Sequence, residues 1–99
     1  MGEFEQLVLL ALLRLDNDAY GMEVREQIEL RTGRDISYGA VYTTLDRLES
    51  KGFVAHRLGE PTPERGGRAR KYFRVLPEGR RALRDARETL AVMWEGVRL

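Results

Sequence analysis

A cluster of basic side chains in the second half of the chain carries chemistry that suits phosphate binding. The cluster falls within ten residues and consists of Arg65, Arg68, Arg70, Lys71 and Arg74. Guanidinium and ammonium groups donate hydrogen bonds to phosphate oxygens and neutralise their charge. If the segment is a strand, alternation places Arg68, Arg70 and Tyr72 on one face and Lys71 and an inward-pointing Phe73 on the other. A charged edge strand that resists aggregation would carry the same residues, so the neighbouring elements must decide between the two interpretations.

A helix is expected directly before the basic segment, from Ser37 to Lys51. Ser37 is a favourable N-cap, Gly52 follows the C-terminus, and apolar residues recur inside it at the spacing of a buried face. The outward positions carry hydroxyls, a glycine that permits close approach and an arginine: Tyr38, Gly39, Tyr42, Thr43 and Arg47. With Ser37, these groups could contact phosphate oxygens, base edges and thymine methyl groups. The alternative is that a tyrosine, above all Tyr42, packs into the domain and that Gly39 only relieves crowding between helices.

A helix followed by a basic hairpin is the arrangement of a winged helix-turn-helix. Strands are expected at residues 53–58 and 68–75, on either side of a turn that contains two prolines and the pair Gly66-Gly67. Ile36, in the link before the helix, is a candidate third strand. In such a domain the helix enters the major groove while the hairpin lies against the phosphates. The predicted fold class is mainly α with a small β-hairpin wing, a winged helix-turn-helix plus a C-terminal dimerisation helix.

The first expected helix, residues 3–15, is apolar nearly all round. A helix without a polar face is buried on more than one side. In a chain of 99 residues this indicates contact with a second subunit as well as with its own core. We expect that contact through Phe4, Leu7 and Leu10.

The second helix is expected at residues 19–32, with Tyr20, Val24 and Ile28 as its buried stripe. Gly33 should close it in the left-handed conformation. The turn Asp16-Asn17-Asp18 before it should supply the N-cap.

A final helix is expected from Glu78 to Arg98, with Pro77 near its first turn. Apolar residues recur along it at heptad spacing: Leu83, Ala86, Leu90, Met93 and Val97. Because the winged domain looks complete without this helix, we expect residues 1–76 to bind DNA and residues 77–99 to form a dimerisation helix that packs with residues 3–15. Trp94 lies beside the seam, where it either anchors the interface or lines a pocket for a planar ligand.

Charge and composition exclude several classes of function. The net charge of +1 hides an uneven distribution: residues 1–36 hold 4 basic and 8 acidic side chains, whereas residues 37–76 hold 8 basic and 4 acidic. Such asymmetry directs a polyanion to one part of the surface. With no cysteine and one histidine, His56, no metal site, cofactor site or catalytic motif is predicted. The longest apolar run is too short for a membrane span, and we expect a cytoplasmic protein that is not an enzyme.

Three segments resemble the PadR-type family of transcriptional regulators. They are the helix and first strand at residues 37–54, the return strand and helix start at residues 67–79, and Tyr20-Gly21-Met22. The resemblance implies a bacterial homodimeric repressor that binds a near-palindromic operator, with the last helix joined to the first helix of the partner. It also implies the short branch of the family, in which some members bind planar drugs or flavins beside a tryptophan placed as Trp94 is. Glu60 and Glu64 depart from the plain basic turn of the family.

The sequence therefore predicts a DNA-binding transcriptional regulator that acts as a repressor and is released by a small-molecule effector. One alternative is a winged-helix module that binds another protein through the outward face of residues 37–51 and lacks sequence-specific DNA binding. Another is a protein that is chiefly a small-molecule sensor, with Trp94 in the ligand site.

Overall fold

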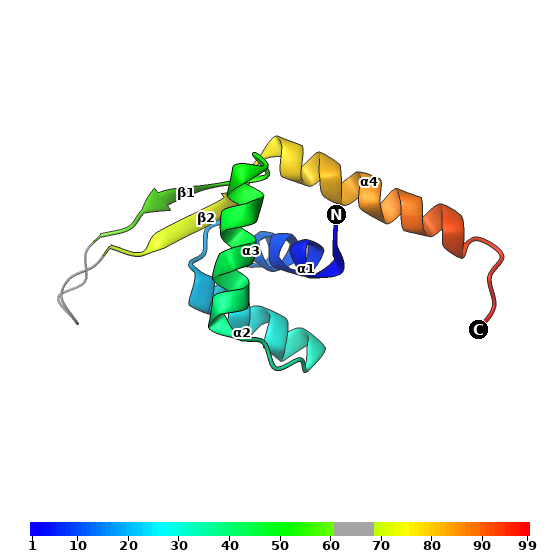
Figure 1. Cartoon of the computed structure of the whole chain (residues 1–99), viewed down its shortest axis with the longest axis horizontal. Helices are drawn as coiled ribbons and strands as arrows, with labels where there is room; N and C mark the ends of the chain where they lie inside the picture. The colour runs from blue at the N-terminus through cyan, green and yellow to red at the C-terminus, as the bar shows by residue number, and fades with distance from the viewer. Residues whose placement is uncertain (61–68) are drawn as a thin grey trace.

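Four helices and one β-hairpin form the protein, and the computed structural model describes residues 1–60 and 69–99. The elements in chain order are α1 (Glu3–Arg14), α2 (Gly21–Thr32), α3 (Tyr38–Ser50), β1 (Val54–Leu58), β2 (Lys71–Val75) and α4 (Pro77–Trp94). Helices α1, α2 and α3 pack together, while the hairpin and α4 extend from this bundle in opposite directions (Figure 1). The predicted class, mainly α with a hairpin wing and a C-terminal helix, is confirmed.

The core lies where the three-helix bundle meets the base of the hairpin. Phe73 of β2 is its largest fully buried side chain and points inward as alternation predicted. Val41, Leu45 and Leu48 of α3 are also fully buried, which confirms their assignment to the inner face. Burial of side chains of this size contributes about 1.5–3 kcal/mol each, so packing rather than intrinsic helix propensity holds α3 in place.

The hairpin is antiparallel, with Val54 opposite Val75 and Leu58 opposite Lys71. A third segment joins it, but this segment does not contain the candidate Ile36. Ala19 pairs with Phe73 instead, through N–H···O bonds of 3.2 and 2.7 Å.

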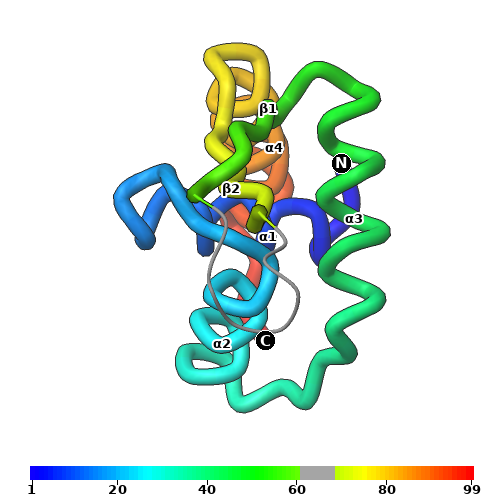
Figure 2. Tube along the Cα trace, turned by 90° about the vertical axis from the view of Figure 1, so that its left-hand side faces the viewer, coloured from blue at the N-terminus to red at the C-terminus, as the bar shows by residue number. Residues whose placement is uncertain are grey.

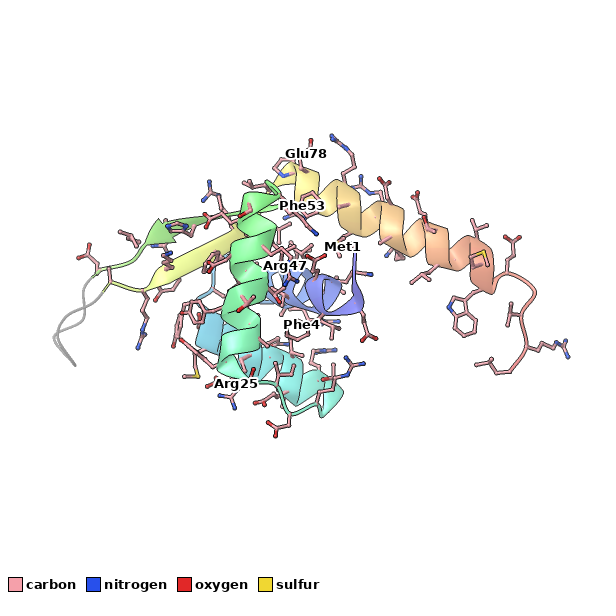
Figure 3. The ribbon with its side chains drawn as sticks, viewed as in Figure 1. Met1, Phe4, Arg25, Arg47, Phe53 and Glu78 are labelled. Atoms are coloured by element: carbon pink, nitrogen blue, oxygen red, sulfur yellow. The ribbon has the colours of Figure 1, made fainter. Side chains whose placement is uncertain are left out.

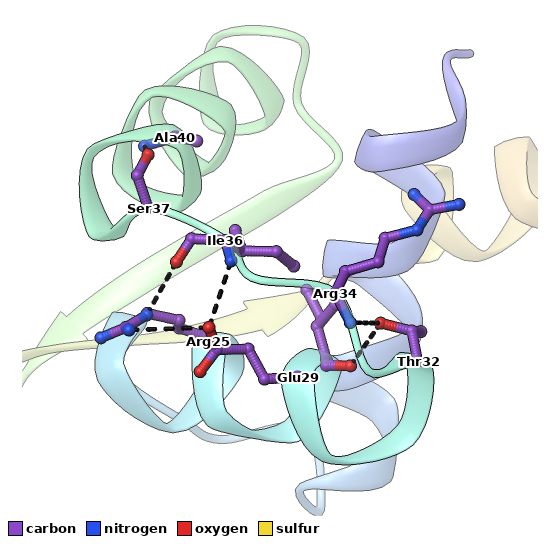
Figure 4. A network of polar contacts seen from close by, with 8 residues as sticks. Arg25, Glu29, Thr32, Arg34, Ile36, Ser37 and Ala40 are labelled. Atoms are coloured by element: carbon purple, nitrogen blue, oxygen red, sulfur yellow. Dashed lines mark hydrogen bonds and ion pairs between the residues drawn. The ribbon is translucent and has the colours of Figure 1, made fainter.

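The backbone groups of Ile36 are occupied by α2, which is why this residue cannot join the sheet. Arg25 Nε donates to the Ile36 carbonyl at 2.8 Å, and the Ile36 N–H donates to Glu29 Oε2 at 3.1 Å (Figure 4). The Ile36 side chain is buried in the core. The link between α2 and α3 is therefore held by side chains of α2 rather than by the wing.

The turn between α1 and α2 also differs from the prediction. Asp16 and Asn17 both adopt positive φ, 59° and 56°, a conformation that Asn and Asp tolerate better than most residues. Asn17 bonds the backbone of Val75 twice, donating from Nδ2 to its carbonyl at 3.2 Å and accepting its N–H at 2.6 Å. The N-cap of α2 is Tyr20 rather than a residue of the turn, and its N–H donates to Glu23 Oε1 at 3.1 Å.

Helix α4 begins at Pro77, one residue before the prediction, and ends at Trp94, four residues early. Its first turn lies tightly on the bundle, because a Cβ at Gly79 would come within 2.4 Å of the Phe53 carbonyl oxygen. The distal half carries exposed apolar side chains, Trp94 among them. Only the start of this helix is therefore covered by its own chain.

Candidate nucleic-acid interface

The first turn of α3 presents its small and hydroxyl-bearing residues to solvent. The Ser37 hydroxyl oxygen accepts the Ala40 N–H at 3.1 Å, which confirms Ser37 as the N-cap. Tyr38, Gly39 and Thr43 are exposed. Apart from Gly39 itself, its chain neighbours and the adjacent backbone of α3, no described atom lies within 4 Å of the position that a Gly39 Cβ would take. This turn is therefore accessible to a binding partner and could enter a groove on its surface.

Tyr42 is half-buried and packs between α3 and α2. A Cβ on Gly21 would meet its ring at 2.8 Å, so glycine is needed there for the tyrosine to fit. Its hydroxyl bonds that of Tyr38 at 3.1 Å, with the two ring centroids 4.7 Å apart. Burial, followed by the hydrogen bond with Tyr38, raises the pKa of Tyr42 to about 12. The Tyr42 ring therefore packs into the domain, as the alternative interpretation stated, while its hydroxyl contacts the exposed Tyr38.

A stack of arginines and tyrosines joins the base of the wing to the start of α2. The Arg70 guanidinium lies over the Tyr20 ring at 4.5 Å, and Tyr20 meets Tyr72 edge-on at 5.5 Å between centroids. Arg57 lies over the other side of this pair, 4.6 Å from the Tyr72 centroid. We call Arg57, Tyr72, Tyr20 and Arg70 the wing stack.

The two arginines of the wing stack differ in their electrostatic partners. Arg57 donates to both carboxylate oxygens of Asp18, at 3.1 and 2.8 Å. These bonds hold the pKa of Asp18 below its usual value and raise that of Arg57. No ion pair of Arg70 is found in the described part of the chain. Among the described residues, the positive charge of Arg70 is therefore not matched by a carboxylate.

Arg47 lies at the other end of α3 and faces the first turn of α1 (Figure 3). Its guanidinium is 4.0 Å from the carboxylate of Glu5, and Lys51 Nζ donates to the same carboxylate at 2.9 Å. Burial is the largest single effect and opposes ionisation of Glu5, but the hydrogen bond and charge of Lys51, the Gly2 N–H and the charge of Arg47 together hold the pKa of Glu5 below its usual value. Arg47 keeps about half of its side chain exposed, at 54%.

The predicted site residues fall into separate groups in space. Tyr38 and Tyr42 contact each other on α3, and Arg70 and Tyr72 both contact Tyr20 at the start of α2. Figure 2 views the backbone from the hairpin side, with α3 on the right and α2 at the lower left. Lys71 is exposed on β2, and Arg47 lies apart with Glu5. Arg65 and Arg68 lie outside the described residues.

Sequence reasoning missed two members of the wing stack, Tyr20 and Arg57. Tyr20 was expected in the buried stripe of α2, but it caps the helix and stands half-exposed against Arg70. The register of the hairpin, which sets Arg57 opposite Tyr72, could have identified Arg57. No sequence signal places Tyr20, because its position depends on the bridge between Ala19 and Phe73.

The predicted dimer residues on α1, on α4 and just after α4 differ in how far they are exposed to solvent. Phe4, Leu7, Leu83 and Ala86 are half-buried against their own chain, whereas the exposed members are Leu10, Leu90, Met93 and Val97. Between the two helices lies an open groove of about 540 Å³, lined by Leu10, Leu83, Leu90 and Trp94 among others. Trp94 is 54% exposed.

Comparison with known proteins decides the family. The transcriptional regulator PadR-like family matches residues 9–85. The chain belongs to this family. The resemblance found in the sequence is confirmed, and the family and the curated relative of this chain are transcriptional regulators rather than enzymes.

Individual relatives agree with this assignment. The transcriptional regulator Rv3488 of Mycobacterium tuberculosis is 35% identical over 75 residues, which cover 76% of this chain and 65% of that protein. A PadR family regulator from Eggerthella lenta is 32% identical with a TM-score of 0.70, covering 92% of this chain and 77% of that one. A PadR family regulator from Clostridium difficile has a TM-score of 0.76 at 24% identity, covering 95% and 93%, which supports the fold alone.

Two kinds of feature are absent from the described residues. No helix there is both long enough and apolar enough to cross a membrane. No group of three acidic or histidine side chains is arranged there to hold a metal ion.

Proposed function

We propose that the protein binds a near-palindromic operator as a homodimer and represses transcription by excluding polymerase. The observation that carries this proposal is the convergence at Tyr42. The open first turn of α3 bonds to Tyr42 through Tyr38, and the Tyr42 ring packs against Gly21, the neighbour of the Tyr20 that stacks on Arg70. A surface for base contacts and a charge for phosphates thus occupy one side of the molecule.

The roles follow from the placement of each side chain. Ser37, Tyr38, Gly39 and Thr43 approach base edges in the major groove, because they form the exposed start of α3. The phosphate contacts come from Arg70, Lys71 and Tyr72 at the wing, from Arg47, and from the predicted Arg65 and Arg68. Arg47 holds a phosphate on the flank of the groove with the exposed part of its side chain.

Dimerisation is proposed through α4 and α1. Leu90, Met93 and Val97 expose 51–71% of their surface on one seam of the chain, and a partner would remove this apolar surface from water. Two recognition helices related by a two-fold axis should then lie about 34 Å apart, one turn of DNA.

Effector release is proposed at the groove between α1 and α4. The groove is lined by four leucines, three arginines and Trp94 among others, a composition that suits a planar molecule with an apolar body. Titration of such compounds against Trp94 fluorescence tests this part. Binding that leaves operator affinity unchanged would refute an effector role.

Selection of binding sites from random DNA tests the central proposal. We expect a two-fold symmetric consensus with half-sites one turn apart. An absence of enrichment at low salt would refute DNA binding and favour the protein-interaction module. Repression itself is tested by transcription in vitro from a promoter that overlaps the selected site, where added protein should lower the transcript yield.

Dimerisation is tested with Leu90→Glu, which puts a charge on the seam. The matched control is Val92→Glu, because Val92 is also exposed on α4, at 67%, but lies off the seam. Sedimentation should show monomers for the first variant and dimers for the control. Dimers in both would exclude this seam as the interface.

A further inference from the structure

Tyr20 occupies the point where the wing, α2 and α3 are tied together. Its neighbour Ala19 is bonded to Phe73 of β2 in both directions, so the backbone before Tyr20 is fixed against the wing. Its other neighbour, Gly21, packs against the ring of Tyr42 in α3. A side chain on this short segment therefore has a set position relative to both the wing and the recognition helix.

The Tyr20 ring holds Arg70 without neutralising it. A guanidinium stacked on an aromatic face keeps its charge, and its N–H groups remain free at the edge to donate to a phosphate. Arg57 in the same stack differs from Arg70, because its charge is already paired with the carboxylate of Asp18. Both arginines are held by a tyrosine ring, but only Arg70 lacks a carboxylate partner in the described chain.

We infer that Tyr20 is a positioning residue for DNA binding, which fixes the Arg70 guanidinium so that it meets a backbone phosphate. The inference rests on the proposed function and adds a residue that does not itself contact DNA. The contact carries no sequence preference, because its ligand is the phosphate group common to all duplexes. The edge-on contact between Tyr72 and Tyr20 completes the support from the wing side.

Salt titration on a mixed-sequence duplex tests the inference. Removal of one phosphate contact lowers the slope of log affinity against log salt by about 0.9. Arg70→Ala should lose this amount per protomer. Tyr20→Leu should lower both the slope and the affinity, the latter about two- to fivefold per protomer as the stacking is lost. Tyr20→Phe keeps the ring and should behave as wild type.

Two further variants separate positioning from a structural role. Arg57→Ala removes an equally stacked arginine that is already paired, and it should leave the salt slope unchanged. The double variant Tyr20→Leu/Arg70→Ala should bind no more weakly than Arg70→Ala alone. Penalties that simply add, or a Tyr20→Leu variant with the wild-type slope, would overturn the inference.

Arg70→Lys keeps the result interpretable should Tyr20→Leu fail to fold. Lysine keeps the charge but lacks the planar group that stacks, so affinity should fall about two- to fivefold per protomer and the slope should fall as it does for Tyr20→Leu. Wild-type affinity for this variant would overturn the inference. Failure of the wild-type protein to bind any duplex at low salt would instead refute the proposed function itself.

Discussion

Replacement of Gly39 by alanine should stabilise the protein and weaken its binding to DNA. Gly39 lies in the first turn of α3, is exposed, and has space around the position of a Cβ. The added methyl therefore meets nothing in the described chain. It would project from the turn that we place nearest the floor of the major groove.

The magnitudes of the two effects follow from this geometry. Alanine is favoured over glycine by about 0.8–1 kcal/mol in a helix interior, and we expect roughly 0.5 kcal/mol near the helix start. In a domain of this size that raises Tm by about 2–4 °C. Loss of one good base contact costs about 1–3 kcal/mol, so affinity for the selected site should fall at least about fivefold.

Urea unfolding and fluorescence anisotropy with a labelled duplex measure the two effects separately. Ala40→Gly is the matched control, because it changes helix propensity in the opposite sense, at an exposed position in the same turn, and adds no atom. It should lower stability and leave affinity near wild type. A Gly39→Ala protein that binds as tightly as wild type would refute the close approach of this turn to DNA.

Three further substitutions test the scaffold. Glu5→Gln should lower the free energy of unfolding by about 1–2 kcal/mol near neutral pH. Because the folded-state pKa of Glu5 is lowered from 4.5, the difference in stability from wild type should shrink as pH falls below that value. Urea titrations at pH 7 and pH 3 that give equal differences would contradict the pairing with Lys51. Asn17→Ala should cost about 3 kcal/mol, since two hydrogen bonds are lost and alanine must adopt positive φ, while Asn17→Gly should cost about 2 kcal/mol; equal unfolding midpoints for both would refute the strain argument. Gly79→Ala should lower stability by about 1–3 kcal/mol, because its Cβ would strike the Phe53 carbonyl, and an unchanged Tm would show that α4 can shift.

The parts of the fold that depend on repeated spacing could be predicted from the sequence. Val41, Leu45 and Leu48 share one face of any helix, and alternation around Phe73 sets the inner face of a strand. Caps and breakers fixed the ends of α3 within about one residue. The predicted end of α4 was less accurate, because apolar residues continue past Trp94 while the backbone leaves helical geometry at Glu95, with a ψ of 122°.

The candidate site could be predicted only where one element carries it. The buried face of α3 could be predicted from its apolar spacing, and this predicted that Tyr38, Gly39 and Thr43 are exposed, as the structure shows. The pairing of Arg70 with Tyr20 joins residues 50 positions apart and depends on a single bridge at Ala19. A one-residue bridge leaves no periodic pattern in a sequence, which is also why the sequence offered Ile36 as a candidate third strand and did not identify Ala19.

The uncovered distal half of α4 has a consequence for how such a regulator responds to its own abundance. If two protomers must first associate through that helix, the concentration of the DNA-competent species rises with the square of protomer concentration until association saturates. Promoter occupancy would then change steeply over a narrow range of expression. A modest change in synthesis or dilution by cell growth could switch the target gene without any small molecule.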